Sequence, residues 1–312
     1  MDFNFSTLFQ QVINGLSLGS VYALIAVGYS LVYSILSFSN FAHGGFLVVG
    51  GYICYGLLTG FDVAFGREVL LSVPSMGGIW LAGLGAMAGA GAVAVLTERL
   101  AYKPIREHTS MTLYLLIASM GVSIVIENIF VILVGGRFRA LPQGTFPAAT
   151  FDLGGGVTVN ASDLLSLGFA VFFLGGLQFF LMRTRWGLAI RAAACDLRTA
   201  GLMGVNVSRL IGIVFFVAGI LAAVGGVFLS ARYTLYPQLG GITTKAFVAA
   251  VIGGLGSLPG AVVGSLLLGL AEMLTAGFVS SQMRDLVVFS MLVIMLLIKP
   301  AGFFGKQISD KI

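Results

Sequence analysis

The chain has 312 residues, of which 58% are hydrophobic and only 9% are charged, with a formal net charge of +5. A soluble domain of this size could not bury so much apolar surface, so the composition excludes a soluble enzyme and indicates a polytopic membrane protein. The basic residues fall mainly in short segments between apolar runs, where they orient a membrane protein, and nucleic acid is therefore not expected as a partner.

The first long apolar stretch is interrupted by polar residues. Helices are predicted over Leu8–Leu36, where Gly15 and Gly19 allow a neighbouring helix to approach closely, and over Phe46–Leu58. Polar backbone at membrane depth is tolerated only inside protein or beside a cavity. The interruption is therefore a candidate for the translocation path, although hydrogen bonding to the freed backbone explains its polar side chains equally well. Its candidate residues are Asn40, His43 and Gly44.

Two loops and two helices are expected next. Thr59–Ser75 reads as an exposed loop, and Gly77–Leu96 as a glycine- and alanine-rich helix. A basic loop is predicted over Glu98–Arg106, followed by a membrane span over Met111–Val134. This span carries Glu127, and an ionisable group inside a span is expensive enough to be a candidate for the path.

The middle of the chain contains the longest polar stretch, Gly135–Ser162, in which Phe151 and Val157–Val159 flank a glycine turn and predict a small hairpin outside the membrane. A span over Leu164–Met182 then leads to a basic segment, Arg183–Arg209, with five arginines against one acid. Its charge places this segment at the cytoplasmic surface.

A short helix is predicted over Leu188–Ala200 within the basic segment, ended by Gly201. Four small or apolar side chains share one face of this helix: Leu188, Ala192, Cys195 and Thr199. Arginine content alone favours a solvated loop that only sets topology, whereas the apolar face favours contact with another protein.

The last third begins with a span over Leu210–Leu229 and contains a second interruption. The apolar run after Lys245 is too short to cross the membrane before the polar turn at Gly256–Pro259, and Lys245 itself is expected to reach the interface. Spans over Ala261–Phe278 and Asp285–Ile298 follow. Further candidates for the path come from this region: Gly253, Gly254, Gly256, Ser257 and Glu272.

These elements predict an all-α polytopic membrane protein with about eight to nine transmembrane segments, including short or broken helices. The chain is expected to form a single permease domain with a probable inverted repeat. Its parts would be a first half over about 8–134, a connecting span at 164–182, a cytoplasmic loop at 183–209 and a second half at 210–298.

The sequence resembles the permease subunits of branched-chain amino acid ABC importers, of the high-affinity transport type. The resemblance is collinear over nearly the whole chain and is carried by Asn14–Tyr29, Asn40–Gly44, Tyr102–Arg106, Arg191–Asn206 and Lys245–Ala261. Two positions depart from the family pattern. Gly45 stands where the family commonly has Glu, and Cys195 stands where it commonly has an acid.

The resemblance implies that the chain translocates branched-chain or other hydrophobic amino acids across the cell membrane, delivered by an external solute-binding protein. It also implies a second homologous permease subunit and two cytoplasmic ATPase subunits as partners, besides membrane lipid. The chain contains no phosphate-binding loop, so ATP and magnesium would be bound by the partner subunits, and this chain would hold no cofactor, catalytic residue or metal.

The resemblance further assigns two cytoplasmic contact regions. Coupling to the ATPase is expected at Arg191, Asp196, Leu197, Arg198, Gly201, Gly204 and Asn206. A secondary contact, for which a topology loop is the stronger interpretation, is expected at Tyr102, Pro104 and Arg106.

Two alternatives remain open. Relatives with the same framework carry urea, short amides or other amino acids. An ion-coupled secondary transporter would instead use Glu127 and Glu272 as coupling groups, but it would leave the basic segment without a role.

Overall fold

The computed structural model describes residues 5–65, 68–73, 78–109, 111–152, 154 and 156–305. Seven helical stretches in this part of the chain are long and apolar enough to cross a membrane: Phe5–Leu36, Ile79–His108, Thr112–Val134, Ala161–Arg183, Val207–Tyr233, Leu258–Phe278 and Ser281–Ile298. The apolar helix His43–Thr59 is shorter, and so is the helix Thr243–Gly253. This architecture confirms the predicted all-α polytopic membrane fold, whereas the inverted repeat stays a prediction.

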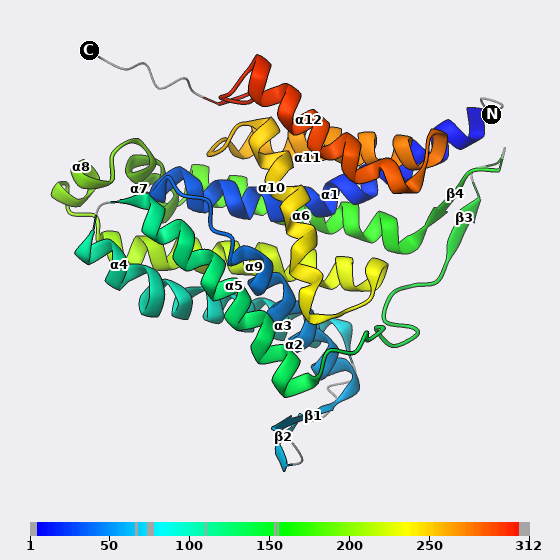
Figure 1. Ribbon diagram of the computed structural model, residues 1–312, viewed down its shortest axis with the longest axis horizontal. Helices are drawn as coiled ribbons and strands as arrows, with labels where there is room; N and C mark the ends of the chain where they lie inside the picture. The colour runs from blue at the N-terminus through cyan, green and yellow to red at the C-terminus, as the bar shows by residue number, and fades with distance from the viewer. Residues whose placement is uncertain are drawn as a thin grey trace. The chain divides into compact units, whose positions relative to one another are not determined.

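The elements follow one another along the chain as drawn in Figure 1. The helices of the first half are α1 (Phe5–Leu36), α2 (His43–Thr59), α3 (Ile79–Thr97), the π-helix η1 (Glu98–Tyr102), α4 (Lys103–His108) and α5 (Thr112–Val134). Those of the second half are α6 (Ala161–Arg183), α7 (Arg185–Cys195), α8 (Leu197–Leu202), α9 (Val207–Tyr233), the 3₁₀-helix η2 (Pro237–Ile242), α10 (Thr243–Gly253), α11 (Leu258–Phe278), the 3₁₀-helix η3 (Ser281–Met283) and α12 (Arg284–Ile298).

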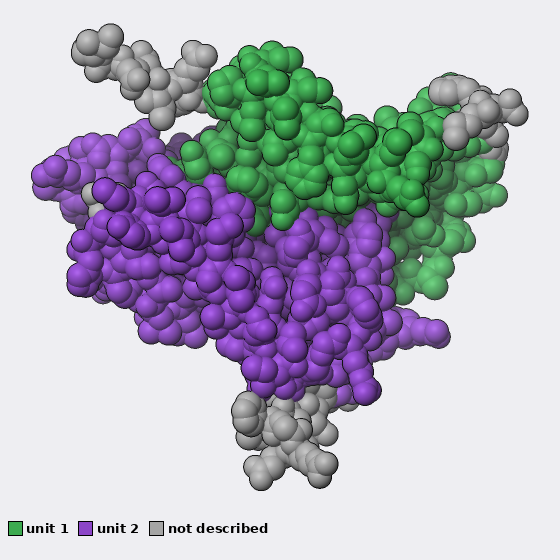
Figure 2. Space-filling model, viewed as in Figure 1, with its two compact units in different colours: residues 1–34, 146–176, 244–312 green, residues 35–145, 177–243 purple. Residues whose placement is uncertain are grey.

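The chain divides into two compact units, coloured separately in Figure 2. Unit 1 comprises Met1–Ser34, Phe146–Gly176 and Thr244–Ile312, and unit 2 comprises Ile35–Thr145 and Leu177–Thr243. Each unit therefore draws on segments from both halves of the chain. The single permease domain with halves on either side of a connecting span stays a prediction.

Close backbone contact between helices holds unit 1 together. A Cβ atom on Gly15 of α1 would lie 2.9 Å from the Cα of Leu270, and one on Gly19 would lie 2.9 Å from the Cα of Leu266, both in α11. From the other side, a Cβ on Gly269 would lie 2.6 Å from the Cα of Gly19. The predicted close approach at Gly15 and Gly19 is thus confirmed, and it replaces the hydrophobic drive that lipid cannot supply.

The core of unit 2 is built in the same way from α2, α3 and α9. A Cβ on Gly50 of α2 would lie 2.5 Å from the Cα of Ala223 in α9. A Cβ on Gly219 of α9 would lie 2.7 Å from the carbonyl oxygen of Ala90 in α3. Because these contacts join backbones directly, α2 is held firmly although its 17 residues are few for an untilted membrane crossing.

Two short hairpins project from the helices. β3 (Thr150–Asp152) pairs antiparallel with β4 (Thr158–Asn160), which confirms the hairpin predicted around the glycine turn. The exposed loop predicted over Thr59–Ser75 is wrong in part, because β1 (Phe61–Phe65) and β2 (Glu68–Val73) form an antiparallel pair there. Valine occurs in both strands and phenylalanine occurs in β1, and both residue types favour strands. Residues 66, 67 and 74–77 of this region lie outside the described residues.

The basic loop predicted over Glu98–Arg106 is also wrong, since the chain stays helical from α3 to the end of α4. In an α-helix, Pro104 would clash with the carbonyl group four residues earlier. The π-helix η1 changes this spacing, and the N–H of Lys103 donates to the carbonyl of Glu98, five residues back. The wider turn lets the helix continue past the proline.

Substitution of Gly50 tests the close packing of unit 2. Gly50→Ala should lower stability by about 1–3 kcal/mol, because the added methyl group meets backbone that cannot move aside. Gly121→Ala is the matched control, since a Cβ there meets nothing within 4 Å and alanine favours the helix by about 1 kcal/mol. Thermal unfolding in detergent measures both variants. Equal midpoints for the two variants would contradict this packing.

Candidate functional site

The first interruption lies in unit 2, between α1 and α2. Ser37 has a φ of +53°, and α2 begins at His43. The buried Asn40 accepts a hydrogen bond through Oδ1 from the backbone N–H of Ala42 at 3.2 Å, and a second from the hydroxyl of Tyr102 at 2.8 Å. Its Nδ2 is buried without a hydrogen-bond partner among the described residues. Asn40 thus orders the turn, and its contact with a solute stays a prediction.

His43 and Gly44 lie at the start of α2 and are both buried. The His43 ring packs edge-on against Phe46, and a Cβ on Gly44 would lie 2.7 Å from the carbonyl oxygen of Gly240 in η2. The departure at Gly45 has a local reason, because a Cβ there would lie 2.9 Å from Cδ1 of Ile126. A larger residue at this position would require Ile126 to move.

The second interruption lies in unit 1, between α10 and α11. The turn uses positive φ angles at Gly254 (+108°) and Gly256 (+83°). Ser257 then caps α11, because its hydroxyl oxygen accepts the N–H of Gly260 at 3.2 Å. Gly253 lies against the backbone of Gly260 so closely that a Cβ could not be added. These contacts give each of the four predicted path residues a structural role, and their contribution to a path stays a prediction.

The segment after α12 forms hydrogen bonds with the backbone at the same interruption. Helix α10 ends at Gly253 and leaves carbonyl groups without partners inside the helix. The N–H of Phe303 donates to the carbonyl of Ile252 at 2.9 Å, and the N–H of Phe304 donates to that of Gly253 at 2.9 Å. Residues of the segment after α12 therefore satisfy the polar backbone exposed by the break.

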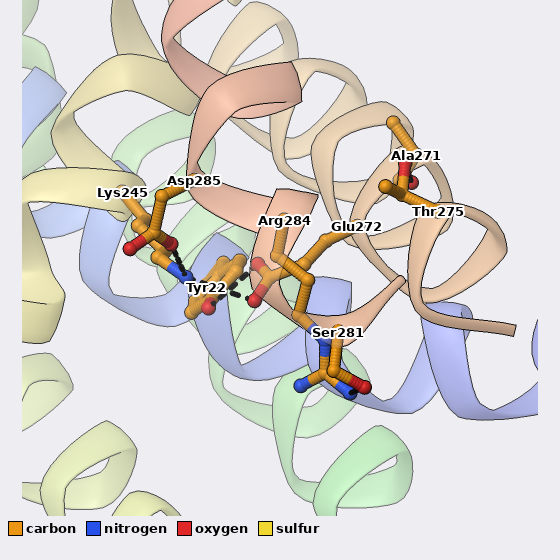
Figure 3. A network of polar contacts seen from close by, with 8 residues as sticks. All are labelled: Tyr22, Lys245, Ala271, Glu272, Thr275, Ser281, Arg284 and Asp285. Atoms are coloured by element: carbon orange, nitrogen blue, oxygen red, sulfur yellow. Dashed lines mark hydrogen bonds and ion pairs between the residues drawn. The ribbon is translucent and has the colours of Figure 1, made fainter. Parts of the chain in front are cut away.

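A buried acid in unit 1 is neutralised by a lysine, as Figure 3 shows. Glu272 of α11 is 1% exposed and accepts hydrogen bonds from the ammonium group of Lys245 at 2.9 Å and from the hydroxyl of Tyr22 at 3.1 Å. Lys245 also pairs with Asp285 of α12 at 2.7 Å. These two acids hold the ammonium group, and the expectation that Lys245 extends to the interface stays a prediction. This network joins α1, α10, α11 and α12.

Glu127 of α5 differs from Glu272 in its surroundings. It is half-buried and accepts a hydrogen bond from the Ser123 hydroxyl at 3.3 Å. Among the residues that the structure describes, no basic side chain forms an ion pair with it. Since an ionised group in a span must face water, a partner or a path, Glu127 stays a candidate for the translocation path.

The cytoplasmic basic segment forms two helices, so the single helix predicted over Leu188–Ala200 is wrong. Helix α7 ends at Cys195 and α8 begins at Leu197. The carboxylate of Asp196 between them accepts the N–H of Arg198 at 2.8 Å, the N–H of Thr199 at 3.0 Å and the Thr199 hydroxyl at 2.6 Å. An aspartate that caps a helix so fully favours a new start over continuation.

The end of α8 also differs from the prediction. Gly201 lies within α8, and the left-handed residue that ends it is Gly204, with a φ of +90°. The N–H of Val205 donates to the carbonyl of Ala200 at 3.1 Å, in the pattern of a glycine-terminated helix. Asn206 then caps α9 by accepting the N–H of Arg209 at 3.0 Å.

The two faces of α7 have different surroundings. Its buried residues are Gly187, Ile190 and Ala193. The face predicted to be apolar is the exposed one: Leu188, Ala192, Cys195 and Thr199 all lie at the surface, beside Arg191 and Arg198. Leu202 and Met203 at the end of α8 are 82% and 81% exposed. Leu197 is half-buried. We call Leu188, Ala192, Cys195, Thr199, Leu202 and Met203, with the two arginines, the α7–α8 surface.

The structure changes which residues can form the predicted secondary cytoplasmic contact. Tyr102 is fully buried, so its assignment as a surface contact is wrong, because the helix continues through η1 and turns this side chain inward. Pro104 is exposed, and Arg106 is half-buried and pairs with the buried Glu98 at 2.9 Å. The predicted secondary contact with the ATPase is therefore limited to Pro104 and Arg106.

The spans, the two interrupted helices and the acids within the membrane define a multi-pass membrane protein of the transporter class. Residues 11–296 match the family described as the permease component of branched-chain amino acid transport systems, and the chain belongs to this family.

Relatives of similar length support this membership. The chain is 36% identical to the high-affinity branched-chain amino acid transport system permease protein LivH of Salmonella typhimurium, over 100% of both chains. It is also 36% identical to the corresponding permease protein BraD of Pseudomonas aeruginosa, over 97% of both. A solved structure, PsaBC from Streptococcus pneumoniae in complex with Fab, superposes with a TM-score of 0.47 at 13% identity, covering 96% of this chain and 94% of that one.

Removal of one charge from the Lys245–Glu272 ion pair tests whether this pair stabilises the fold. Lys245→Met should lower stability by about 3–5 kcal/mol, because the carboxylate of Glu272 would stay buried without a cation. The double variant Lys245→Met/Glu272→Gln should recover most of this loss, since glutamine can still accept from Tyr22. Thermal unfolding in detergent compares them. Asp285→Asn is the control with a small effect, as Asp285 is 68% exposed. Equal losses in the single and double variants would contradict a coupled ion pair.

The cap on α8 should show a defined pH dependence. The hydroxyl and N–H of Thr199 hold the pKa of Asp196 below its ordinary value. With a lowered folded-state pKa, the cap contributes stability above the unfolded-state pKa, and the contribution is lost as pH falls through the folded-state pKa.

The protection of the Arg198 and Thr199 amides against hydrogen exchange should therefore stay constant down to about pH 4 and fall only below it, after correction for intrinsic rates. The amide of Arg209, capped by the uncharged Asn206, serves as the internal control. Loss of protection near pH 6 would contradict the lowered pKa.

Proposed function

We propose that this chain is the permease subunit of an ATP-driven importer and that it translocates branched-chain or other hydrophobic amino acids. Family membership over residues 11–296 and full-length relatives of this description support the proposal. The observation that carries it in this chain is the α7–α8 surface, which combines exposed apolar side chains with arginines.

The α7–α8 surface requires a protein partner. The segment between two membrane spans lies in water, and its arginines place it on the cytoplasmic side. Leu188, Leu202 and Met203 are each more than half exposed there, and apolar side chains gathered in water mark an interaction site. An ATPase subunit with a groove for two short helices is the partner that fits an importer.

The other components of the importer follow from this assignment. Two cytoplasmic ATPase subunits bind ATP and magnesium, because this sequence contains no phosphate-binding loop. A second homologous permease completes the pathway, and an external solute-binding protein delivers the amino acid and provides most of the selection. The chain itself is not an enzyme.

Coupling begins where the α7–α8 surface joins a long span. Asn206 caps α9 only two residues after Gly204 ends the α8 turn, so displacement of α8 acts directly on the first turn of α9. Closure of the ATPase pair moves this segment, and the cavity between the two permeases opens alternately outward and inward. The path in this chain includes the amide of Asn40, whose nitrogen has no hydrogen-bond partner among the described residues, and the carboxylate of Glu127, which has no basic partner among them.

Uptake by the assembled importer in vesicles tests the proposal. Radiolabelled leucine, isoleucine or valine should enter only with ATP inside the compartment that holds the ATPases, and with the binding protein on the opposite side. Urea and short amides, offered in the same assay with their own binding proteins, should not be carried. Uptake driven by a proton or sodium gradient without ATP would contradict the proposal and favour a secondary transporter.

A double substitution tests the coupling surface. Asp196→Ala/Arg198→Ala should abolish ATP-driven uptake and weaken co-purification with the ATPase at least about tenfold, a loss of about 1.4 kcal/mol in binding. Asp152→Ala/Arg137→Ala is the matched control, because it removes the same two charges from exposed positions on the opposite side of the predicted topology. Co-purification at the wild-type level in the first variant would contradict the assignment.

A further inference from the structure

The turn between α1 and α2 is held by two other helices of unit 2. Tyr102 in η1 donates its hydroxyl to Asn40 at 2.8 Å, and Ser119 in α5 accepts the backbone N–H of Phe41 through Oγ at 3.1 Å. Asn40, Tyr102 and Ser119 are all buried. The turn itself contains a residue in the left-handed region, Ser37, so its conformation depends on such external contacts.

Tyr102 also connects the turn to α9. Its ring lies 5.6 Å from that of Phe38 in the turn and 5.5 Å from that of Phe215 in α9, between centroids. The side chain thus contacts the segment before α2 and the long span that starts after the α7–α8 surface. A fully buried aromatic ring in close packing passes displacement from one neighbour to the other.

The segment that carries Tyr102 is rigidly tied to the surface helix α4. Glu98, at the start of η1, is 1% exposed and pairs with Arg106 in α4 at 2.9 Å. This ion pair joins residues on either side of Pro104, because Glu98 begins the π-helix and Arg106 lies in α4. Single π-turns inside helices often occur at functional sites. Movement of α4 at the predicted cytoplasmic surface therefore moves Tyr102 with it.

We propose that Tyr102 is a positioning residue that links α4 and α9 to the start of α2 through its hydrogen bond to Asn40. Displacement on the cytoplasmic side then shifts the turn at Ser37–Ala42 and the first residues of α2, where Asn40, His43 and Gly44 lie. The inference rests on the proposed function and adds to it a route by which ATPase movement reaches the interrupted helix. It also explains why Tyr102 lies inside the protein and not on the ATPase contact surface.

The isolated chain in detergent provides the first test, which needs no ATPase. Arg106→Ala should release α4 and raise hydrogen exchange at the amides of Ala42 and His43 by about fivefold, the effect of one lost buried hydrogen bond. Tyr102→Phe should raise hydrogen exchange at the same two amides by a similar factor. The double variant should show no further increase, because both changes break the same link. Independent, multiplicative effects of the two substitutions would overturn the proposal.

The assembled importer provides the second test. Tyr102→Phe should keep ATP hydrolysis within about twofold of wild type and lower the amino acid imported per ATP by about fivefold. Tyr114→Phe is the matched control, because Tyr114 is 51% exposed on α5, and it should behave as wild type. Hydrolysis and uptake that fall in equal proportion, or not at all, would show Tyr102 to be structural only.

The two hypotheses fail in different ways. A wild-type complex without ATP-driven uptake would refute the proposed function, and the exchange experiment on the isolated chain would still support or overturn the link. Loss of folding in Tyr102→Phe would appear as a lower unfolding midpoint. In that case Glu98→Gln, which breaks the ion pair with Arg106 and keeps Tyr102 and Asn40 in place, must reproduce the lower import per ATP, and wild-type import per ATP would overturn the proposal.

Discussion

The structure depends on one constraint, which is that polar groups exposed where a membrane helix stops must find partners inside the protein. At the turn before α2, the side chains of Asn40 and Ser119 accept the backbone N–H groups of Ala42 and Phe41. At the end of α10, the N–H groups of Phe303 and Phe304 fill the freed carbonyls. Short helices persist in a membrane protein because distant segments complete their hydrogen bonds.

The same constraint distinguishes the acids that are neutralised by a basic partner from one that, in the described part of the chain, is not. Glu272 is neutralised by Lys245, and Glu98, near the predicted cytoplasmic surface, is neutralised by Arg106, so both stabilise helix contacts. Glu127 accepts a hydrogen bond from the Ser123 hydroxyl and has no basic partner among the described residues. We therefore favour Glu127 over Glu272 as the acid that faces a hydrated path, and both path assignments stay predictions.

Much of the fold can be predicted from the sequence, because long apolar runs indicate spans and glycine pairs indicate close helix contacts wherever they occur. The spans, the interruption after α10 and the hairpin at Thr150–Asn160 were all predictable from such patterns. The continuous helix past Pro104 was not, since a π-turn leaves no local signal. The break at Asp196 was recognisable, because aspartate is a preferred N-cap residue at a helix start. The partners of Lys245 and Tyr102 lie far along the chain, where periodicity gives no information.

The native cysteines can test whether the α7–α8 surface is cytoplasmic and covered by the ATPase. Cys195 is exposed on this surface and Cys54 is buried, so a membrane-impermeant maleimide reports on one site. We expect labelling of Cys195 in inside-out vesicles, none in right-side-out vesicles, and protection when the ATPase subunits are bound. Labelling from the outer side, or equal labelling with and without the ATPase, would contradict it.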